Sequence, residues 1–183
     1  GSGSMQVPLD SILTEVMEWG MDEGIVVDGA LAMSEAQRVA FWRLREEQPE
    51  GQRRLGAQLK HDLSVPPHQL AEFLDRANDE CGQVLKGVTI NTFGHLGDGN
   101  VHYNLSPPIG QRDFSGLDSE FAVNLGRLAT EMEGSFAAEH GIGRTKTALA
   151  DVLRDPVERN LMARLKKSLD ETKQLNPGVL VSS

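Results

Sequence analysis

The stretch Thr92-Phe-Gly-His95-Leu-Gly-Asp-Gly-Asn-Val-His102-Tyr-Asn104 predicts a β-hairpin, and this hairpin decides the fold. Its dipeptide Asp98-Gly99 lies between strand-like residues, which is typical of a two-residue type I′ turn because both central positions need a positive φ. A turn centred there pairs His95 directly with His102, with Cβ atoms roughly 5 Å apart on one face of the sheet. The two imidazoles are therefore predicted to form a pair.

His95 and His102 are candidate metal ligands, because neutral imidazole is the commonest nitrogen donor to protein-bound metals. The alternative is an exposed hairpin tip with incidental histidines, which is the more frequent case for two histidines alone. Nearby glycines favour a ligand site, since a backbone without Cβ atoms allows close approach. Asn104 follows on the same predicted face as His102 and adds a hydrogen-bonding group.

A second cluster is Glu139-His140-Gly-Ile-Gly143-Arg-Thr-Lys146, expected at the C-terminal end of the longest predicted helix, residues 117–138. Glu139 would add an anionic ligand to the two histidines, and a His2Glu set with an open position is typical of catalytic zinc. His140 would then serve as a general base. The alternative, of equal weight for this cluster alone, is a glycine cap beside charged residues at a helix end.

Two upstream cations are candidates for binding substrate carboxylates. Arg45 can hold a carboxylate through two parallel hydrogen bonds, and Lys60 supplies a point charge. The alternative for any single arginine or lysine is a solvated surface residue, which is far more common. His61 and His68 have no partner pattern, and no role is assigned to them.

Helices alternate with strands around the hairpin, which predicts an α+β fold with an antiparallel sheet and helices packed on one face. Helices are expected from Pro8, from the capping box Ser34-Glu-Ala-Gln37, and over residues 67–81, 117–138, 145–153 and 156–169. Strands are expected over residues 24–28, 59–65 and 87–93, the last leading into the hairpin. Pro49-Glu-Gly51 is expected to break the second helix.

Composition is that of an ordinary globular protein, with 183 residues, 39% apolar and 25% charged. The formal charge of −9 argues against a nucleic-acid partner. No apolar run approaches the roughly 20 residues that cross a bilayer, no signal peptide is seen, and the single Cys81 suits a reducing compartment, so a cytoplasmic location is expected. Residues 1–5 look like a cloning scar, and residues 6–183 are expected to form a single domain.

Several blocks of sequence together resemble the C-terminal substrate, or cap, domain of FAD-linked oxidases of the vanillyl-alcohol oxidase superfamily. They are Leu44-Arg-Glu46, Lys60-His-Asp-Leu-Ser-Val-Pro66, Gly94-His-Leu-Gly-Asp-Gly-Asn-Val-His102-Tyr-Asn104, Glu139-His-Gly-Ile-Gly-Arg-Thr-Lys146 and, more weakly, Leu175-Asn-Pro-Gly178. The resemblance is strongest to the D-2-hydroxyacid dehydrogenase branch, which includes D-2-hydroxyglutarate and D-lactate dehydrogenases and the glycolate oxidase flavin subunit. It implies a ferredoxin-like cap domain.

The resemblance also implies a metal site and a base. His95, His102 and Glu139 resemble the ligands of a divalent metal, zinc or manganese. His140 resembles the base that takes the proton of the substrate C2 hydroxyl while a hydride leaves C2 for FAD. Metal coordination would lower the pKa of that hydroxyl.

Substrate carboxylates are the expected ligands of three further residues that match the family pattern, Arg45, Lys60 and Asn104. One position departs from the pattern. Pro49 stands one helical turn after Arg45, where relatives that bind a five-carbon diacid have a hydroxyl residue. The resemblance therefore does not extend to that second-carboxylate contact.

The resemblance implies FAD bound mainly by a flavin-binding domain that nothing in this chain resembles, on the same polypeptide or a separate chain. The chain alone is then expected to be inactive. Other expected partners are a small 2-hydroxyacid and an electron acceptor that could hold the protein at the inner membrane; a homodimer is left open. Two alternative functions stay open: a flavin-less module that binds a hydroxyacid or a metal, and a His2Glu zinc hydrolase with His140 as its base.

Overall fold

The computed structural model describes residues 8–54 and 56–181, so the predicted cloning scar at residues 1–5 lies outside the described residues. The chain divides into two compact units between Pro49 and Glu50. The expectation of one domain over residues 6–183 stays a prediction. In the described ranges, no helix is long and apolar enough to cross a lipid bilayer.

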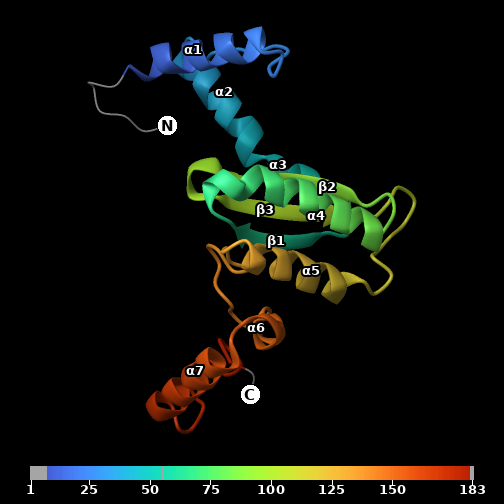
Figure 1. Ribbon diagram of the computed structural model, residues 1–183, viewed down its shortest axis with the longest axis vertical. Coiled ribbons are helices and arrows are strands. Elements are labelled where there is room, and N and C mark those ends of the chain that lie inside the picture. The colour runs from blue at the N-terminus through green and yellow to red at the C-terminus, as the bar shows by residue number, and fades with distance from the viewer. Residues whose placement is uncertain (1–7, 55, 182–183) are drawn as a thin grey trace. The chain divides into compact units, whose positions relative to one another are not determined.

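The N-terminal unit contains two helices, α1 (Leu9–Asp22) and α2 (Glu35–Glu46) (Figure 1). The predicted capping of α2 is present, because the Ser34 hydroxyl accepts the backbone N–H of Gln37. The predicted strand at residues 24–28 is wrong. Backbone N–H groups of Ile25 and Val26 both bond to the carbonyl of Gly20, so this segment folds back as a turn after α1.

The predicted break around Pro49 is only partly right. Helix α2 ends at Glu46, but a short helix, α3 (Gln48–Arg53), follows directly and contains the proline. Pro49 is the second residue of α3, where its missing N–H needs no intrahelical partner. The chain therefore remains helical as it enters the second unit.

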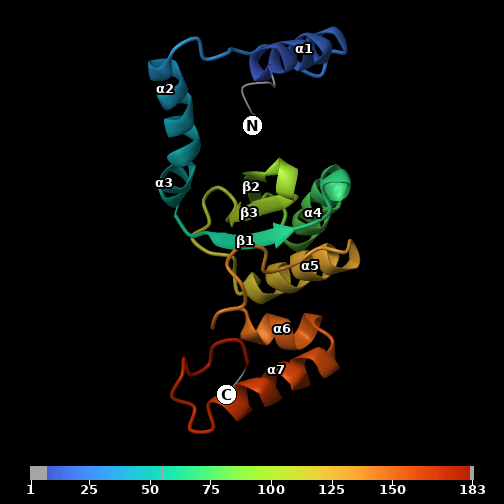
Figure 2. The ribbon, with the colours of Figure 1, turned by 90° about the vertical axis from the view of Figure 1, so that its left-hand side faces the viewer.

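The second unit is built on a three-stranded antiparallel sheet with strand order β1-β3-β2. The strands are β1 (Leu59–Ser64), β2 (Thr89–His95) and β3 (Asn100–Ser106). Helices α4 (Leu70–Val84), entered by a 3₁₀ turn at Pro67–Gln69, and α5 (Asp118–Glu131) lie on one side of the sheet (Figure 2). The predicted α+β fold with helices on one face is confirmed, and its order β-α-β-β-α is that of a ferredoxin-like fold without the final strand.

The sheet has two chemically different faces. On β3, Val101, Tyr103 and Leu105 are buried against the helices, while His102 and Asn104 alternate with them and point to the other side. The largest fully buried side chains of the core are Tyr103, Phe73, Phe121, Leu63, Leu105, Leu125, Leu128 and Cys81. Burial of these side chains pins the sheet to α4 and α5 and leaves the opposite face polar.

The hairpin between β2 and β3 forms, but its turn differs from the prediction. His95 lies opposite Asn100, and His102 lies opposite Phe93. A four-residue connection, with a 3₁₀ turn at Leu96–Asp98 and Gly99 at φ 65°, replaces the type I′ turn. His95 and His102 are therefore diagonal rather than direct neighbours, yet still share one face because they differ from a direct pair by two residues.

The C-terminal part contains α6 (Thr147–Leu153) and α7 (Pro156–Leu169), and α7 has the predicted bounds. Helix α5 is shorter than predicted and ends at Glu131. Glu133 then has a positive φ of 60°, and a Cβ on Gly134 would lie 1.9 Å from the carbonyl oxygen of Ser64. The chain thus leaves the helix to run against β1, so residues 132–146 form a loop instead of a helix end.

We expect Gly99→Ala to destabilise the protein by about 2 kcal/mol or more, whereas Gly97→Ala changes stability by less than about 0.5 kcal/mol. Gly99 has a positive φ, and a Cβ there would lie 1.8 Å from the Val65 carbonyl oxygen; around Gly97 no atom lies within 4 Å. Chemical denaturation of both variants tests this. Equal stability of the two variants would contradict this turn geometry.

His61 lies on the helix-facing side of β1, opposite Tyr103. Its Nε2 atom is buried and has no hydrogen-bond partner among the described residues, and the ring borders a cavity of about 220 Å³ that Lys146 also lines. Burial, and secondarily the charge of Lys146, lower the pKa of His61 to about 4. The folded protein therefore favours the neutral imidazole.

This depressed pKa predicts acid sensitivity. The unfolded chain protonates His61 near its ordinary pKa of 6.5, so the contribution of this group is complete above pH 6.5 and is lost as the pH falls toward 4. Between about pH 7.5 and about pH 5, we expect wild type to lose about 2 kcal/mol more unfolding free energy than His61→Leu. Denaturant titrations at the two pH values measure the difference, and parallel losses in both proteins would contradict it.

Candidate metal and substrate site

Side chains on the face of the sheet opposite α4 and α5 form cross-strand rows, and we call this surface the polar sheet face. Across β1, β3 and β2, the rows are Lys60–Asn104–Asn91, Asp62–His102–Phe93 and Ser64–Asn100–His95. Side chains directly opposite one another on antiparallel strands lie roughly 5 Å apart at Cβ. The register therefore brings a cation, carboxamides, imidazoles and a carboxylate onto one surface.

His95 and His102 meet Glu139 at the hairpin end of this surface. Their ligand atoms all lie within 4.8 Å of one another. The Nε2 atom of His95 is 3.8 Å from Oε1 of Glu139, and Nε2 of His102 is 3.9 Å from Oε2. The sequence predicts these three residues together, although through a different hairpin register and with Glu139 at a helix end, where the structure has a loop.

The donor set of this cluster fits a divalent metal. Two imidazole nitrogens and a carboxylate oxygen form the set found at open catalytic zinc sites. Donor atoms around one tetrahedral zinc ion are about 3.4 Å apart. The three ligand atoms lie within 4.8 Å of one another and must move closer together to share one ion, which the exposed side chains of His95 and Glu139 allow.

Asp62 lies at the centre of the site and was given no role in the sequence analysis. Asp62 is buried, at 4% exposure, and its carboxylate accepts three hydrogen bonds. Oδ2 accepts the backbone N–H groups of Glu139 (2.8 Å) and His140 (2.9 Å), and Oδ1 accepts Nδ2 of Asn100 (3.1 Å). Burial alone would raise the pKa of Asp62, but these hydrogen bonds and the nearby Lys146 hold that pKa below its usual value.

His102 is oriented between two carboxylates. Its Nδ1 atom lies 3.9 Å from Oδ1 of Asp62, and its Nε2 atom faces Glu139. The ring packs at 5.1 Å on Phe93 and stacks at 6.0 Å on the ring of His140. The side chain of His102 is 17% exposed, so its ring has less room to move than the more exposed rings of His95 and His140.

His140 lies beside the cluster but outside it. Its Nδ1 atom is 3.8 Å from Oδ2 of Asp62, and its side chain is 68% exposed. An accessible imidazole next to a carboxylate can take a proton from a bound molecule. The geometry therefore permits the base role expected from the sequence, which stays a prediction.

The loop that carries Glu139 and His140 is fastened to β1 at several points. Ser64 and Ser135 exchange both backbone hydrogen bonds at 2.9 Å. Lys146 Nζ donates to the carbonyls of Phe136 (2.8 Å) and Asp62 (3.4 Å). Burial lowers the pKa of Lys146, although the charge of Asp62 counteracts part of the shift. The loop is therefore held by backbone bonds and one half-buried ammonium group.

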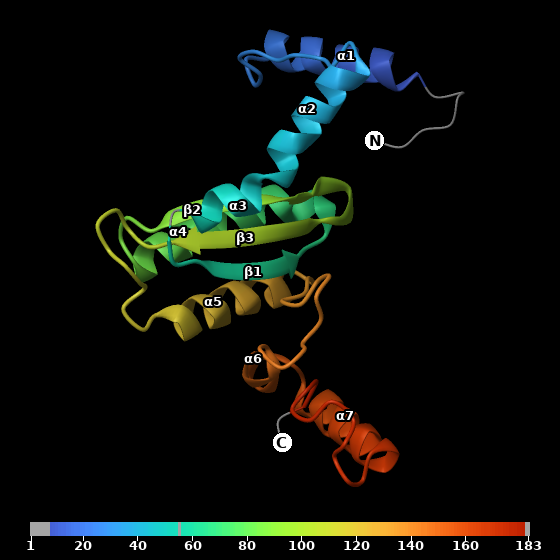
Figure 3. The same ribbon diagram turned by 180° about the vertical axis from the view of Figure 1, so that it is seen from behind.

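Lys60 and Asn104 lie in neighbouring strands, as expected for two groups that share a carboxylate. Lys60 is exposed, whereas Asn104 is buried and its Nδ2 donates to Oε1 of Gln52 at 2.7 Å. Gln52 belongs to the part of α3 that lies in the second unit. This part of α3 lies on the opposite side of the sheet from α4 (Figure 3). The bond to Gln52 occupies one of the two N–H donors of this amide.

Arg45 lies in the last turn of α2 and belongs to the N-terminal unit. Its expected contact with a substrate carboxylate stays a prediction.

Two residues of the site, Asp62 and Gln52, were missed by the sequence analysis. Asp62 could have been found, since alternation along β1 puts it on the same face as Lys60. Gln52 could not, because the segment around Pro49 was interpreted as a helix break and its contact with Asn104 is long-range.

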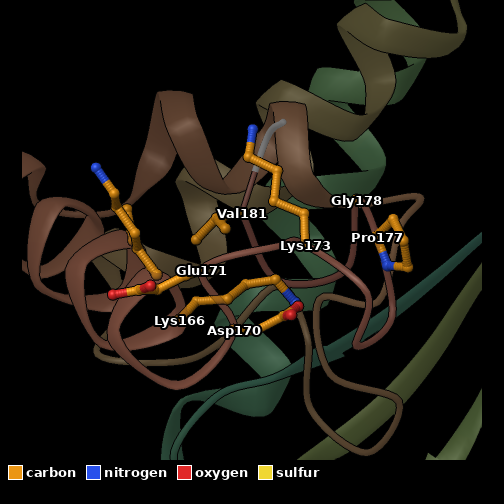
Figure 4. Close-up of a pocket in the computed structure, with 9 residues that line it drawn as sticks. Lys166, Asp170, Glu171, Lys173, Pro177, Gly178 and Val181 are labelled. Atoms are coloured by element: carbon orange, nitrogen blue, oxygen red, sulfur yellow. The ribbon is translucent and has the colours of Figure 1, made fainter.

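A separate cavity of about 310 Å³ lies between α7 and the C-terminal segment (Figure 4). Two of its charged groups, Lys166 and Asp170, stabilise the local fold. Lys166 Nζ donates to the carbonyls of Leu175 and Asn176, and Asp170 accepts the N–H groups of Gln174 and Leu175. Since it contains none of the residues of the metal cluster, this cavity does not compete with the polar sheet face as the candidate site.

Residues 9–180 match the family described as FAD linked oxidases, C-terminal domain. D-2-hydroxyglutarate dehydrogenase of Rattus norvegicus is 33% identical over 165 residues, covering 90% of this chain and 30% of the rat protein. The Xanthomonas citri pv. viticola enzyme of the same name is 35% identical over 162 residues, covering 87% and 34%.

An uncharacterized FAD-linked oxidoreductase of Mycobacterium tuberculosis is 34% identical over 167 residues, which cover 90% of this chain and 33% of that protein. The chain thus spans about a third of the length of the curated relatives it matches. The family match over residues 9–180 includes the hairpin, the loop of residues 132–146 and both strands that flank β3.

Proposed function

The chain belongs to the family of FAD-linked oxidase C-terminal domains, and we propose that it is the substrate- and metal-binding part of a flavin-dependent dehydrogenase. The proposed reaction oxidises a D-2-hydroxyacid to the 2-oxoacid. The observation that carries the proposal is the cluster of His95, His102 and Glu139 with His140 beside it. The names of the rat and Xanthomonas relatives support the substrate class.

His95, His102 and Glu139 would hold a divalent cation, with zinc favoured by two nitrogen donors and one carboxylate. Such a cation, when bound, supplies Lewis-acid polarisation of the C2 hydroxyl. The protein's own contribution is to keep the three side chains on two strands and one loop that hydrogen bonds join together.

His140 would remove the proton of the C2 hydroxyl through its accessible imidazole ring. Its backbone N–H and its Nδ1 atom both face Asp62, so the opposite edge of the ring, with Nε2, is left for the substrate. The carboxylate beside Nδ1 stabilises the imidazolium that forms when the proton is taken.

Lys60, Asn104 and Arg45 are the proposed partners of the substrate carboxylate. Lys60 offers an exposed ammonium group one strand away from Asn104. The bond from Asn104 to Gln52 uses one N–H of the amide, so the other N–H would bind the substrate.

FAD, when bound by a flavin-binding partner domain, supplies the acceptor for the hydride that leaves C2. The family supports such a partner. The electron acceptor that re-oxidises the flavin, and a location in the cytoplasm or at the inner membrane, stay predictions. The chain's role is to present C2 of the substrate with its hydroxyl proton facing His140.

We expect one zinc or manganese ion to bind per chain. His95→Ala, His102→Ala and Glu139→Ala should each weaken binding on the order of 100-fold or more, because each removes a donor atom. His61→Leu is the control, since His61 lies on the helix-facing side of β1. Calorimetric titration of the metal-free chain measures the affinities. Absence of binding to wild type, or loss in the control as well, would refute the metal site.

For the complete gene product with FAD bound, we expect D-2-hydroxyacids to bleach the oxidised-flavin absorbance and their L-enantiomers to leave it unchanged. His140→Asn should lower kcat by roughly 10²- to 10⁴-fold, as expected for loss of a general base. Flavin content before substrate addition is the control for folding. No bleaching by any member of a D-2-hydroxyacid panel would exclude the dehydrogenase, and ester hydrolysis without flavin would favour a hydrolase.

A further inference from the structure

The segment that follows α7 is held by side chains of that helix. In the described chain beyond α7 there is no further helix or strand, so the main-chain groups of this segment need other partners. At its start, Lys166 and Asp170 bind main-chain groups of residues 174–176. The segment then returns from the end of α7 toward α6 (Figure 2). We call residues 174–180 the C-terminal strap.

Arg159 holds the far end of the C-terminal strap. This residue is only 9% exposed, and its guanidinium group donates to the carbonyl of Leu180 at 2.6 Å and, through Nε, to Oδ1 of Asp151 in α6 at 2.8 Å. Arg159, Lys166 and Asp170 follow one another at i, i+7 and i+11, which puts them on one face of α7. One face of this helix therefore binds both ends of the strap.

Leu180 joins the C-terminal strap to the loop that carries the candidate base. Its backbone N–H donates to the carbonyl of Gly143 at 2.9 Å, while its own carbonyl accepts from Arg159. Its φ is 70°, a left-handed conformation that a leucine rarely adopts. Such a conformation persists only where the surroundings enforce it, and here both main-chain groups of the residue are bonded.

The loop between His140 and Gly143 depends on contacts at its two ends. Gly141 and Gly143 have φ values of 66° and 54°, and no atom lies within 4 Å of a Cβ built at either position. Packing at these two glycines therefore does not fix the backbone. Ile142 between them is buried, and its carbonyl accepts a backbone N–H at the start of α6. Asp62 holds the His140 end, and the C-terminal strap holds the Gly143 end.

We propose that Arg159 is a positioning residue for the base His140: through the C-terminal strap it fixes Gly143, and so fixes where the imidazole of His140 lies relative to a bound substrate. The polar contacts of Arg159, which are Asp151, Met162 and Leu180, all lie outside the candidate site, so its effect is indirect. The inference rests on the proposed function for the role of His140, but the hold on the loop can be measured without metal, flavin or substrate.

Two substitutions break this connection at different points. Arg159→Leu removes the donor to the Leu180 carbonyl, whereas Leu180→Pro removes the N–H that bonds to Gly143 and leaves α7 as it is. Arg164→Leu, at an exposed position of the same helix, is the matched control for the first. Leu180→Gly is the control for the second, because glycine keeps the N–H and readily adopts a positive φ.

The first experiment measures amide hydrogen exchange in the metal-free 183-residue chain. In Arg159→Leu and Leu180→Pro, the N–H groups of Glu139 and His140 should exchange at least about 10-fold faster than in wild type, with both controls like wild type. The amide of Tyr103, in the central strand, is the reference for global unfolding. Unchanged exchange in the loop of both variants, or equal acceleration at Tyr103, would overturn the proposal.

The second experiment uses the complete gene product with FAD bound. Arg159→Leu and Leu180→Pro should lower kcat per bound flavin for a D-2-hydroxyacid about 10-fold or more, because a displaced base loses its geometry. KM should stay within about twofold, since the groups that bind substrate are untouched, and Leu180→Gly should match wild type. A merely structural role would reduce flavin content and melting temperature without changing kcat per bound flavin.

The two experiments together separate the possible failures. Unchanged kcat per bound flavin in both variants, despite faster exchange in the loop, would overturn the positioning role. No oxidation of any D-2-hydroxyacid by wild type, with faster loop exchange in the variants, would instead refute the proposed function and support the hold of the C-terminal strap on the loop.

Discussion

The period-two alternation of strand β3 is the constraint on which the rest of the structure depends. β3 is the central strand, so each of its residues has a neighbour on both β1 and β2. Tyr103 and its alternate neighbours are buried beneath α4 and α5, and this burial fixes which side chains point the other way. A slip of one residue would exchange the core with the candidate site, so the register that stabilises the fold also places His102 and Asn104.

Much of this arrangement could be predicted from local sequence. The helices after Ser34 and from Pro156 carry their own start signals, and the polar and apolar residues of the hairpin alternate as strands require. Long-range contacts decided the rest. The hairpin turn is four residues long because Gly99 bonds to Val65, a contact that no local pattern reveals. Helix α5 ends early because Ser135 pairs with Ser64.

The candidate site, too, was predictable in part from local sequence and in part depends on long-range contacts. His95, His102 and Glu139 were predicted as a group from residue chemistry and from a family resemblance. The prediction was wrong about the hairpin register and about the helix end, but neither error separates the three residues. The register error shifted His95 by two positions, which keeps it on the same face. Glu139 reaches the sheet from a loop rather than a helix end, since β1 holds residues 132–146 through backbone bonds. Asp62, which organises both, has no local signature beyond its place in a strand.

The anchoring of the loop through main-chain N–H groups has a consequence for how such a site can change over time. Asp62 holds residues 139 and 140 without contacting their side chains by hydrogen bonds. Any amino acid except proline presents the same N–H groups, so these two positions can exchange one side chain for another while the path of the chain persists. Single substitutions at these two positions can therefore change the chemistry of the site, while the sheet and the backbone of the loop stay the same.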